Sequence, residues 1–93
     1  MTDAEINLAI AKIEHPDVIR PDTNYVFNVD YCNNWNDIGT IIEREGIGLK
    51  RDKNHWEAYR YAVDPSSFWV HYAHAETPTK AAALCYLKMK GVK

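Results

Sequence analysis

The middle of the sequence most constrains the fold, because two of its runs alternate with the two-residue period of a β-strand. In HWEAYRYAV (55–63), Trp56 and Tyr59 would lie on opposite faces, and FWVHYAH (68–74) alternates in the same way. The DPSS between these runs predicts a turn, and a shorter strand is expected at 47–50, followed by the charged turn RDKN. The middle of the chain is therefore predicted to form a small antiparallel meander of two or three strands.

Two helices are predicted before this meander. Thr2 and Glu5 fit the S/T-x-x-E capping box at the start of the first helix, and Pro16 ends it. Asn34 is the predicted N-cap of the second helix, and Gly46 suits the left-handed position at its end. The apolar side chains of this second helix share one face, which is predicted to be buried: Trp35, Ile38, Ile41 and Ile42.

A third helix is predicted after the meander. Thr77 is its N-cap, Pro78 takes the first helical position, where its missing N–H does no harm, and Gly91 ends it. Three successive alanines from Ala81 suit a helix packed closely on a sheet. The order predicts an α+β fold with two N-terminal helices, a small antiparallel β-meander, and a C-terminal helix packed on one sheet face.

Two local features give further expectations. Gly39, in the middle of the second helix, costs roughly 1 kcal/mol relative to alanine, which points to a close packing neighbour. Alternating apolar residues at 25–29 predict a short extended segment before the helix.

The composition is that of a single domain comprising residues 1–93. Hydrophobic residues make up 46% of the chain, which supplies a core at the small end of independently folding domains. No apolar run approaches the roughly 20 residues of a membrane helix, and the acidic N-terminus is unlike a signal peptide. We therefore expect no membrane association and a cytoplasmic location in which Cys32 and Cys85 stay reduced.

Charge is unevenly distributed along the chain. Residues 1–46 carry nine acidic and three basic residues, a net −6, whereas residues 47–93 carry four acidic and eight basic residues, a net +4. The two halves either neutralise each other by packing together or form a bipolar surface that steers a partner or favours a homo-oligomer. Neither half has the strongly basic balance of a general nucleic-acid binder.

The sequence contains no evident catalytic constellation. Cys32 precedes a helix N-terminus, which lowers a thiol pKa, but no base is placed to activate it, so a cysteine-dependent enzyme is the least favoured function. Cys85 is predicted to lie in the core. The four histidines form no metal-binding motif, and His71 and His74 would point to opposite faces of a strand. We therefore expect no catalytic residues, metal ligands or cofactors.

The aromatic content exceeds what one small sheet face can bury, so part of it is expected to form a protein-binding surface. Two surfaces are predicted, one at the corner before the second helix and one on the sheet. The candidate binding residues are Tyr31, Asn33, Asn34, Trp35, Trp56 and Tyr59.

The basic residues Lys50, Arg51 and Lys53 suggest an alternative function. With Trp56 and Tyr59 close behind, they would bind single-stranded nucleic acid through charge and base stacking. A charged hairpin tip is the commoner meaning of such a run, so nucleic-acid binding is the second hypothesis.

Short motifs throughout the chain suggest a family. Glu-Ile-Asn at 5–7 is followed by Tyr31-Cys32-Asn33, by Asp37, by an Ile-Ile pair at 41–42 and by a strand with a tryptophan. The last helix begins with Thr-Pro-Thr-Lys-Ala-Ala, a conservative variant of the Asn-Pro-x-Arg-Ala-Ala that is common in one family of phage proteins. With these motifs the chain resembles the NinX-like family of small phage and prophage proteins, to which no activity is assigned. The segments 16–30 and 68–74 have no counterpart in that pattern. The resemblance implies a phage accessory protein that acts in the bacterial cytoplasm.

The leading hypothesis is therefore a non-catalytic protein that binds a host or phage protein. Asn34 and Asp37 are explained by the helix start, whereas Tyr31, Cys32 and Asn33 are left as either a packing hinge or a contact surface, with the hinge favoured.

Overall fold

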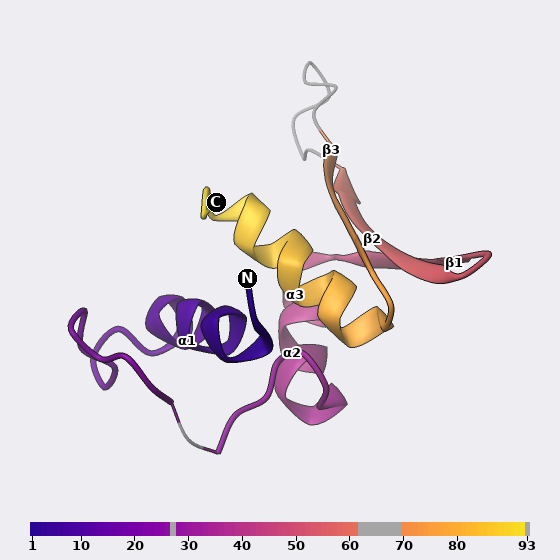
Figure 1. Ribbon diagram of the computed structural model, residues 1–93. Helices are drawn as coiled ribbons and strands as arrows, with labels where there is room; N and C mark the ends of the chain where they lie inside the picture. Colours follow the sequence, from indigo (N-terminus) through magenta and orange to yellow (C-terminus); the bar gives the residue numbers. More distant parts are fainter. Residues whose placement is uncertain (27, 62–69, 93) are drawn as a thin grey trace.

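The computed structural model describes residues 1–26, 28–61 and 70–92, and within them it contains three helices and one three-stranded sheet (Figure 1). The elements are α1 (Asp3–Glu14), α2 (Trp35–Glu45), β1 (Gly48–Asp52), β2 (His55–Tyr61), β3 (Val70–Ala75) and α3 (Pro78–Met89). The predicted α+β architecture is confirmed. The expected DPSS turn and the first two residues of the predicted strand at 68–74 lie outside the described residues.

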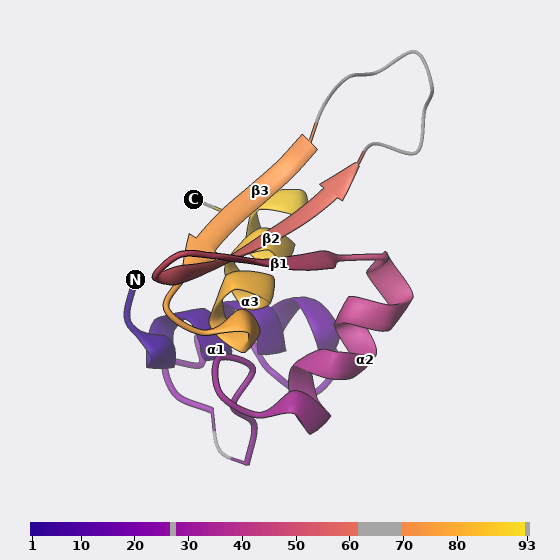
Figure 2. The same cartoon turned by 90° about the vertical axis from the view of Figure 1, so that its right-hand side faces the viewer.

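The three strands form an antiparallel meander in the order β1-β2-β3. Ala58 lies opposite both Leu49 and Ala73, and the small side chains of Ala58 and Ala73 are fully buried beneath α3. The other face of the sheet is not covered by a helix of the described chain (Figure 2). The prediction that the C-terminal helix packs on one sheet face is therefore confirmed.

Helix α3 lies between the sheet on one side and α1 and α2 on the other (Figure 1), and it contacts each of the other five elements. A helix in this central position must be apolar on several sides. This explains the alanine run, because Ala81, Ala82 and Ala83 face different neighbours and all three are fully buried. Cys85 is buried in the same helix, as predicted, and both cysteines are free thiols.

The predicted helix caps are present. Thr2 and Glu5 form the reciprocal capping box, with bonds of 3.2 and 2.9 Å between side chain and backbone. The Asn34 side chain accepts the Asn36 N–H at 2.8 Å, and Gly46 ends α2 with a φ of 68°. These local signals set the helix boundaries independently of the core.

Trp35 departs from its predicted burial. Ile38 and Ile41 are buried and Ile42 is half-buried, but 53% of Trp35 is exposed. Trp35 lies about 90° around the helix from the middle of the buried face, at 100° per residue. It also occupies the first helical turn, at the end of the packed layer, so the prediction that Trp35 begins a buried face is wrong.

Two smaller expectations are also wrong. A Cβ added at Gly39 meets no atom of the described residues within 4 Å, so close packing does not explain this glycine. The described residues of 25–29 join no strand, and Asn28 has a φ of 63°, which interrupts an extended backbone.

Glu14, Arg44 and Tyr86 connect the three helices. Arg44 donates to both carboxylate oxygens of Glu14 at 2.8 and 2.9 Å, and the buried Tyr86 hydroxyl donates to Oε2 of Glu14 at 2.5 Å. The Arg44 guanidinium, with help from Tyr86, holds the pKa of Glu14 below its usual value in spite of burial. Burial and the neighbouring carboxylate raise the pKa of Tyr86. The carboxylate of Glu14 is thus stabilised in its charged form by groups from two other helices.

Candidate functional surfaces

The corner formed by Tyr31, Cys32 and Asn33 is a packing junction between helices. Tyr31 and Cys32 are buried. The Cys32 N–H donates to Oδ1 of Asn7 in α1 at 3.2 Å, and the Cys32 carbonyl accepts the Thr79 hydroxyl of α3 at 2.5 Å. The junction therefore attaches the chain entering α2 to both α1 and α3, which favours the hinge interpretation of this corner.

Polar side chains complete the junction on its outer side. Asn7 donates to Oδ1 of Asp30 at 3.1 Å, and the exposed Asn33 donates to both Asp30 and Asp3. Asp37, in the first turn of α2, accepts the Asp30 N–H at 2.8 Å. Although Asn33 is exposed to solvent, its amide N–H groups therefore form hydrogen bonds within the molecule.

The chemistry of Cys32 is set by its burial. Burial, with the nearby Asp3 and Asp30 carboxylates, raises the pKa of the thiol to about 12. The sulfur lies 3.8 Å from the carbonyl oxygen of Asp3, to which it donates. A thiol in this environment is protonated at neutral pH and lacks the thiolate that a cysteine nucleophile requires.

A shallow hollow of about 370 Å³ lies beside the junction, between α1 and the segment that leads to α2. Asp3, Glu5 and Asp30 give its lining an acidic character, and Tyr25 and Val29 contribute apolar surface. Such a hollow favours cationic or N–H donor groups over anionic ones.

Two large aromatic side chains are exposed near this end of the molecule. Tyr25, at 56% exposed, lines the hollow, and Trp35 begins α2 directly after the junction. The segment before α2 and the start of α2 both lie at the lower end of the molecule in Figures 1 and 2. The predicted surface around Trp35 is therefore accessible, whereas Tyr31 lies in the core behind it and the Asn34 side chain caps the helix.

The second predicted surface is divided between the two faces of the sheet. Trp56 lies on the α3 side, half-buried against the core, with the Arg51 guanidinium 5.7 Å from the centre of its ring. Tyr59 lies on the open side, where its ring covers Gly48: a Cβ on Gly48 would be 2.5 Å from Cζ of Tyr59. The structure does not bring Trp56 and Tyr59 together on one surface.

The basic residues of the nucleic-acid hypothesis are divided in the same way. Lys50 lies opposite Glu57 on the open face, Arg51 lies opposite Trp56 on the other, and Lys53 sits in the turn with a φ of 42°. A groove that tracks a nucleic-acid backbone needs its cations on one side. The geometry thus gives this alternative no additional support, and it stays a prediction.

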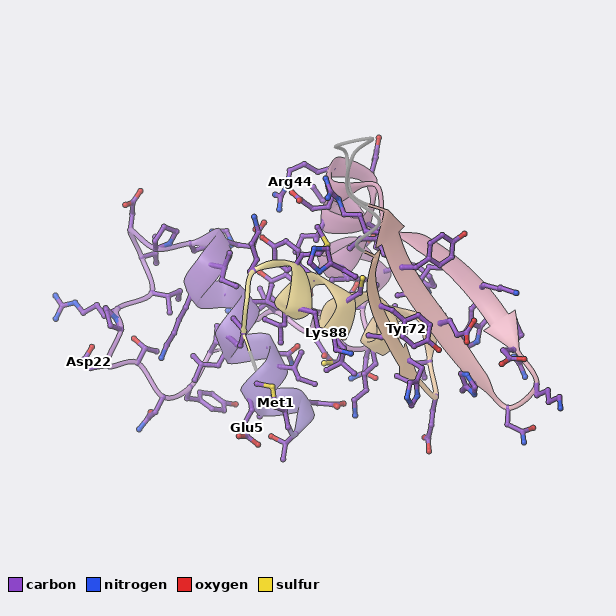
Figure 3. All side chains as sticks on the ribbon, turned by 90° about the horizontal axis from the view of Figure 1, so that it is seen from above. Met1, Glu5, Asp22, Arg44, Tyr72 and Lys88 are labelled. Atoms are coloured by element: carbon purple, nitrogen blue, oxygen red, sulfur yellow. The ribbon has the colours of Figure 1, made fainter. Side chains whose placement is uncertain are left out.

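The open face of the sheet carries a polar cluster that the sequence motifs did not indicate. The Tyr72 hydroxyl donates to Oε1 of Glu57 at 2.7 Å, and the ring of His74 lies 5.3 Å from that of His55. Figure 3 shows Tyr72 on the sheet, on the side of α3 away from Glu5 and Asp22. His71 and His74 lie opposite Arg60 and Glu57, and therefore on opposite faces as predicted.

These features define a small α+β domain whose corner motifs build a structural junction and whose exposed aromatic side chains lie beside it. Residues 1–90 match the family described as Bacteriophage P22, NinX, and the chain therefore belongs to this phage family. It is a small phage accessory protein, and the resemblance seen in its sequence is confirmed. The comparison with curated proteins gave no match. In the part of the chain that the structure describes, every helix is too short or too polar to cross a membrane.

Proposed function

We propose that this phage protein is a non-catalytic binding protein that engages a host or phage protein in the bacterial cytoplasm, through the surface around Trp35. The observation that carries the proposal is the exposure of Trp35, 53% of which is open to solvent at the first turn of α2. Tryptophan is among the residues that most often dominate binding energy at protein interfaces.

Trp35 is mounted on a backbone that is already ordered. The Asn34 cap fixes the start of α2, and the bond from the Asp30 N–H to the Asp37 carboxylate fixes the turn that precedes it. A side chain presented by a rigid element loses less conformational freedom on binding, so more of its contact energy contributes to affinity. Exposed Asn33 and Asn36 on either side supply a polar rim of the kind that surrounds such anchors.

The surroundings of Cys32 support a non-catalytic role, because its thiol pKa is about 12. Nucleic-acid binding through Lys50, Arg51 and Lys53 is kept as the alternative function. A homo-oligomer built on the same Trp35 surface is a distinct outcome, and the experiment below separates it from binding to another protein.

The test is capture from phage-infected host cells with the intact chain carrying an affinity tag, followed by measurement of affinity with the purified partner. The wild type is compared with Trp35→Ala and with Tyr72→Ala, which removes another exposed aromatic side chain from the sheet. We expect wild type and Tyr72→Ala to bind alike, and Trp35→Ala to bind at least roughly tenfold more weakly.

Trp35→Ala is expected to keep the thermal stability of the wild type, since the side chain is exposed, so that lost binding is not lost folding. Equal binding by all three proteins would contradict the proposed surface. Recovery of only the chain itself, with a dimer in solution that Trp35→Ala dissociates, would replace the proposal with self-association.

A further inference from the structure

The turn end of the open sheet face gathers two carboxylates and two imidazoles. The strand register pairs Asp52 with His55 and Glu57 with His74, so all four side chains point away from α3. Nε2 of His55 lies 3.6 Å from Oδ2 of Asp52 and 3.7 Å from Oε1 of Glu57. The imidazole nitrogen is thus placed between two carboxylate oxygens.

We propose that Asp52, His55 and Glu57 bind a divalent metal ion of the zinc type, with His74 as the fourth ligand. One ligand atom from each of the first three residues lies within 4.8 Å of the others. A tetrahedral zinc ion with bonds of about 2.0–2.1 Å holds its ligand atoms about 3.3–3.4 Å apart. The two separations from Nε2 of His55 therefore need to contract by only a few tenths of an ångström. The carboxylate oxygens of Asp52 and Glu57, which lie within 4.8 Å of each other, need to approach by at most about 1.5 Å through side-chain rotation.

The fourth ligand comes from the neighbouring strand. The ring centre of His74 lies 5.3 Å from that of His55, with the ring planes inclined at 56°. Its backbone position is fixed by the pairing of Glu57 with His74 in the β2–β3 ladder. The ligand nitrogens of His74 do not belong to the group of three within 4.8 Å, so His74 completes the shell only if its side chain rotates toward His55, which its place in the ladder permits.

The donor set determines the class of ion. Imidazole nitrogen suits zinc and the later transition metals, whereas magnesium and calcium prefer oxygen ligands alone. The Tyr72 hydroxyl donates to Oε1 of Glu57 at 2.7 Å, and this bond orients the carboxylate as outer-shell partners of metal ligands do. Tyr72 is therefore a positioning residue for the site.

The consequence of binding would be a clamp that joins the β1–β2 turn to β3. Because the four residues come from all three strands, a bound ion adds a link across the sheet that the ladder alone does not provide. The site lies on the open sheet face and Trp35 lies on α2, so this inference is independent of the proposed protein-binding function.

The test is isothermal titration of the intact, untagged, metal-free chain with Zn²⁺ in a buffer that does not coordinate metals, and with Mg²⁺ and Ca²⁺ as comparison ions. The variants are His55→Gln, Glu57→Gln, His74→Gln and Tyr72→Phe. His15→Gln is the matched control, because His15 is an exposed histidine at the end of α1, outside the sheet. Amide chemical shifts report where the ion binds.

We expect one Zn²⁺ per chain, no binding of Mg²⁺ or Ca²⁺ at the same concentrations, and shift changes confined to 52–57 and 72–75. Each ligand variant should weaken binding at least roughly tenfold, and Tyr72→Phe by about tenfold, whereas His15→Gln should leave affinity unchanged. Unaltered affinity in His55→Gln and Glu57→Gln would mean an adventitious ion only and would overturn the site. Unaltered affinity in His74→Gln alone would remove His74 from the ligand set, and one Zn²⁺ per two chains would replace the clamp with a metal bridge between copies.

Discussion

Tyr86→Phe tests whether the link between the three helices contributes as much stability as its geometry implies. The substitution removes only the hydroxyl that donates to Oε2 of Glu14, and leaves the buried ring in place. Glu14 keeps both bonds from Arg44. The hydroxyl also accepts from Nη2 of Arg44 at 3.3 Å, so the change removes one short hydrogen bond to a charged acceptor together with one longer bond from a charged donor.

Its magnitude follows from the exposure of the acceptor. A hydrogen bond to a charged group contributes about 1.5–3 kcal/mol. Glu14 is still 16% exposed, so water replaces part of the lost bond, and we expect a cost at the lower end, about 1.5 kcal/mol. With an unfolding entropy of about 2.1 cal/mol/K for each of 93 residues, this lowers Tm by about 8 °C.

The effect should also depend on pH in a defined direction. Glu14 has a lower pKa in the folded protein than the ordinary value of 4.5 for a glutamate, because Arg44 and Tyr86 hydrogen-bond its carboxylate. Its contribution to stability is therefore complete above that value and is lost as pH falls through the folded pKa. The stability difference between wild type and Tyr86→Phe should therefore stay constant from pH 7 to about pH 5 and narrow below about pH 4.

Urea unfolding at several pH values, followed by circular dichroism, measures both predictions. Tyr72→Phe is the matched control, because it removes the same kind of bond, from a tyrosine hydroxyl to Glu57, at an exposed site. Measured in the presence of a chelator, it should leave Tm unchanged. Equal losses in the two variants, or a Tyr86→Phe effect that persists undiminished to the acid limit of folding, would refute the reasoning.

Three further predictions concern glycines and thiols. Gly48→Ala should destabilise the protein by about 1–3 kcal/mol in thermal unfolding, because its Cβ would lie 2.5 Å from Cζ of Tyr59 and displace the ring; a neutral result would mean that the ring moves freely. Gly39→Ala should instead raise stability by roughly 1 kcal/mol in the same assay, because a Cβ there meets no atom of the described residues within 4 Å and alanine favours a helix. A loss of stability would reveal a packing constraint there. Burial holds the thiol pKa of Cys32 near 12 and that of Cys85 near 11, so neither thiol should react with iodoacetamide at pH 8 until the chain unfolds. Mass spectrometry of the native protein after labelling measures this. Rapid labelling at one site would show that Cys32 is activated.

Local signals explain why the fold was predictable from the sequence. The caps at Thr2, Asn34 and Thr77 each act within three residues of their own position, and the alternation of β2 reports the two sheet faces directly. The helix caps and the strand alternation can therefore both be recognised without knowing the rest of the structure. Trp35 shows the limit of such signals, because periodicity gives the direction of a side chain and not how far the core extends along the helix.

The cluster at Asp52, His55 and Glu57 was missed for a related reason. Its spacing, Asp-x-x-His-x-Glu, matches no metal motif for a helix, and becomes meaningful only when a tight turn places Asp52 opposite His55. His74 enters through the β2–β3 register, which the sequence does not specify across the connecting segment. Sites of this kind depend on strand pairing and are therefore invisible to spacing rules derived from single elements.

The motifs that carry the family resemblance are best explained by architecture. Asn7 from the first motif accepts the backbone N–H of Cys32 from the second, and Asp37 accepts the backbone N–H of Asp30, whose side chain Asn7 also contacts. Each of these groups satisfies a backbone or side-chain partner inside the molecule, and removing one would leave its partner unpaired at a cost of about 1–3 kcal/mol. Residues that build a junction in this way are constrained by folding, whatever the protein binds. We therefore expect the binding surface among exposed side chains that contribute little to the core. Trp35, which is exposed beside the junction, is our leading candidate.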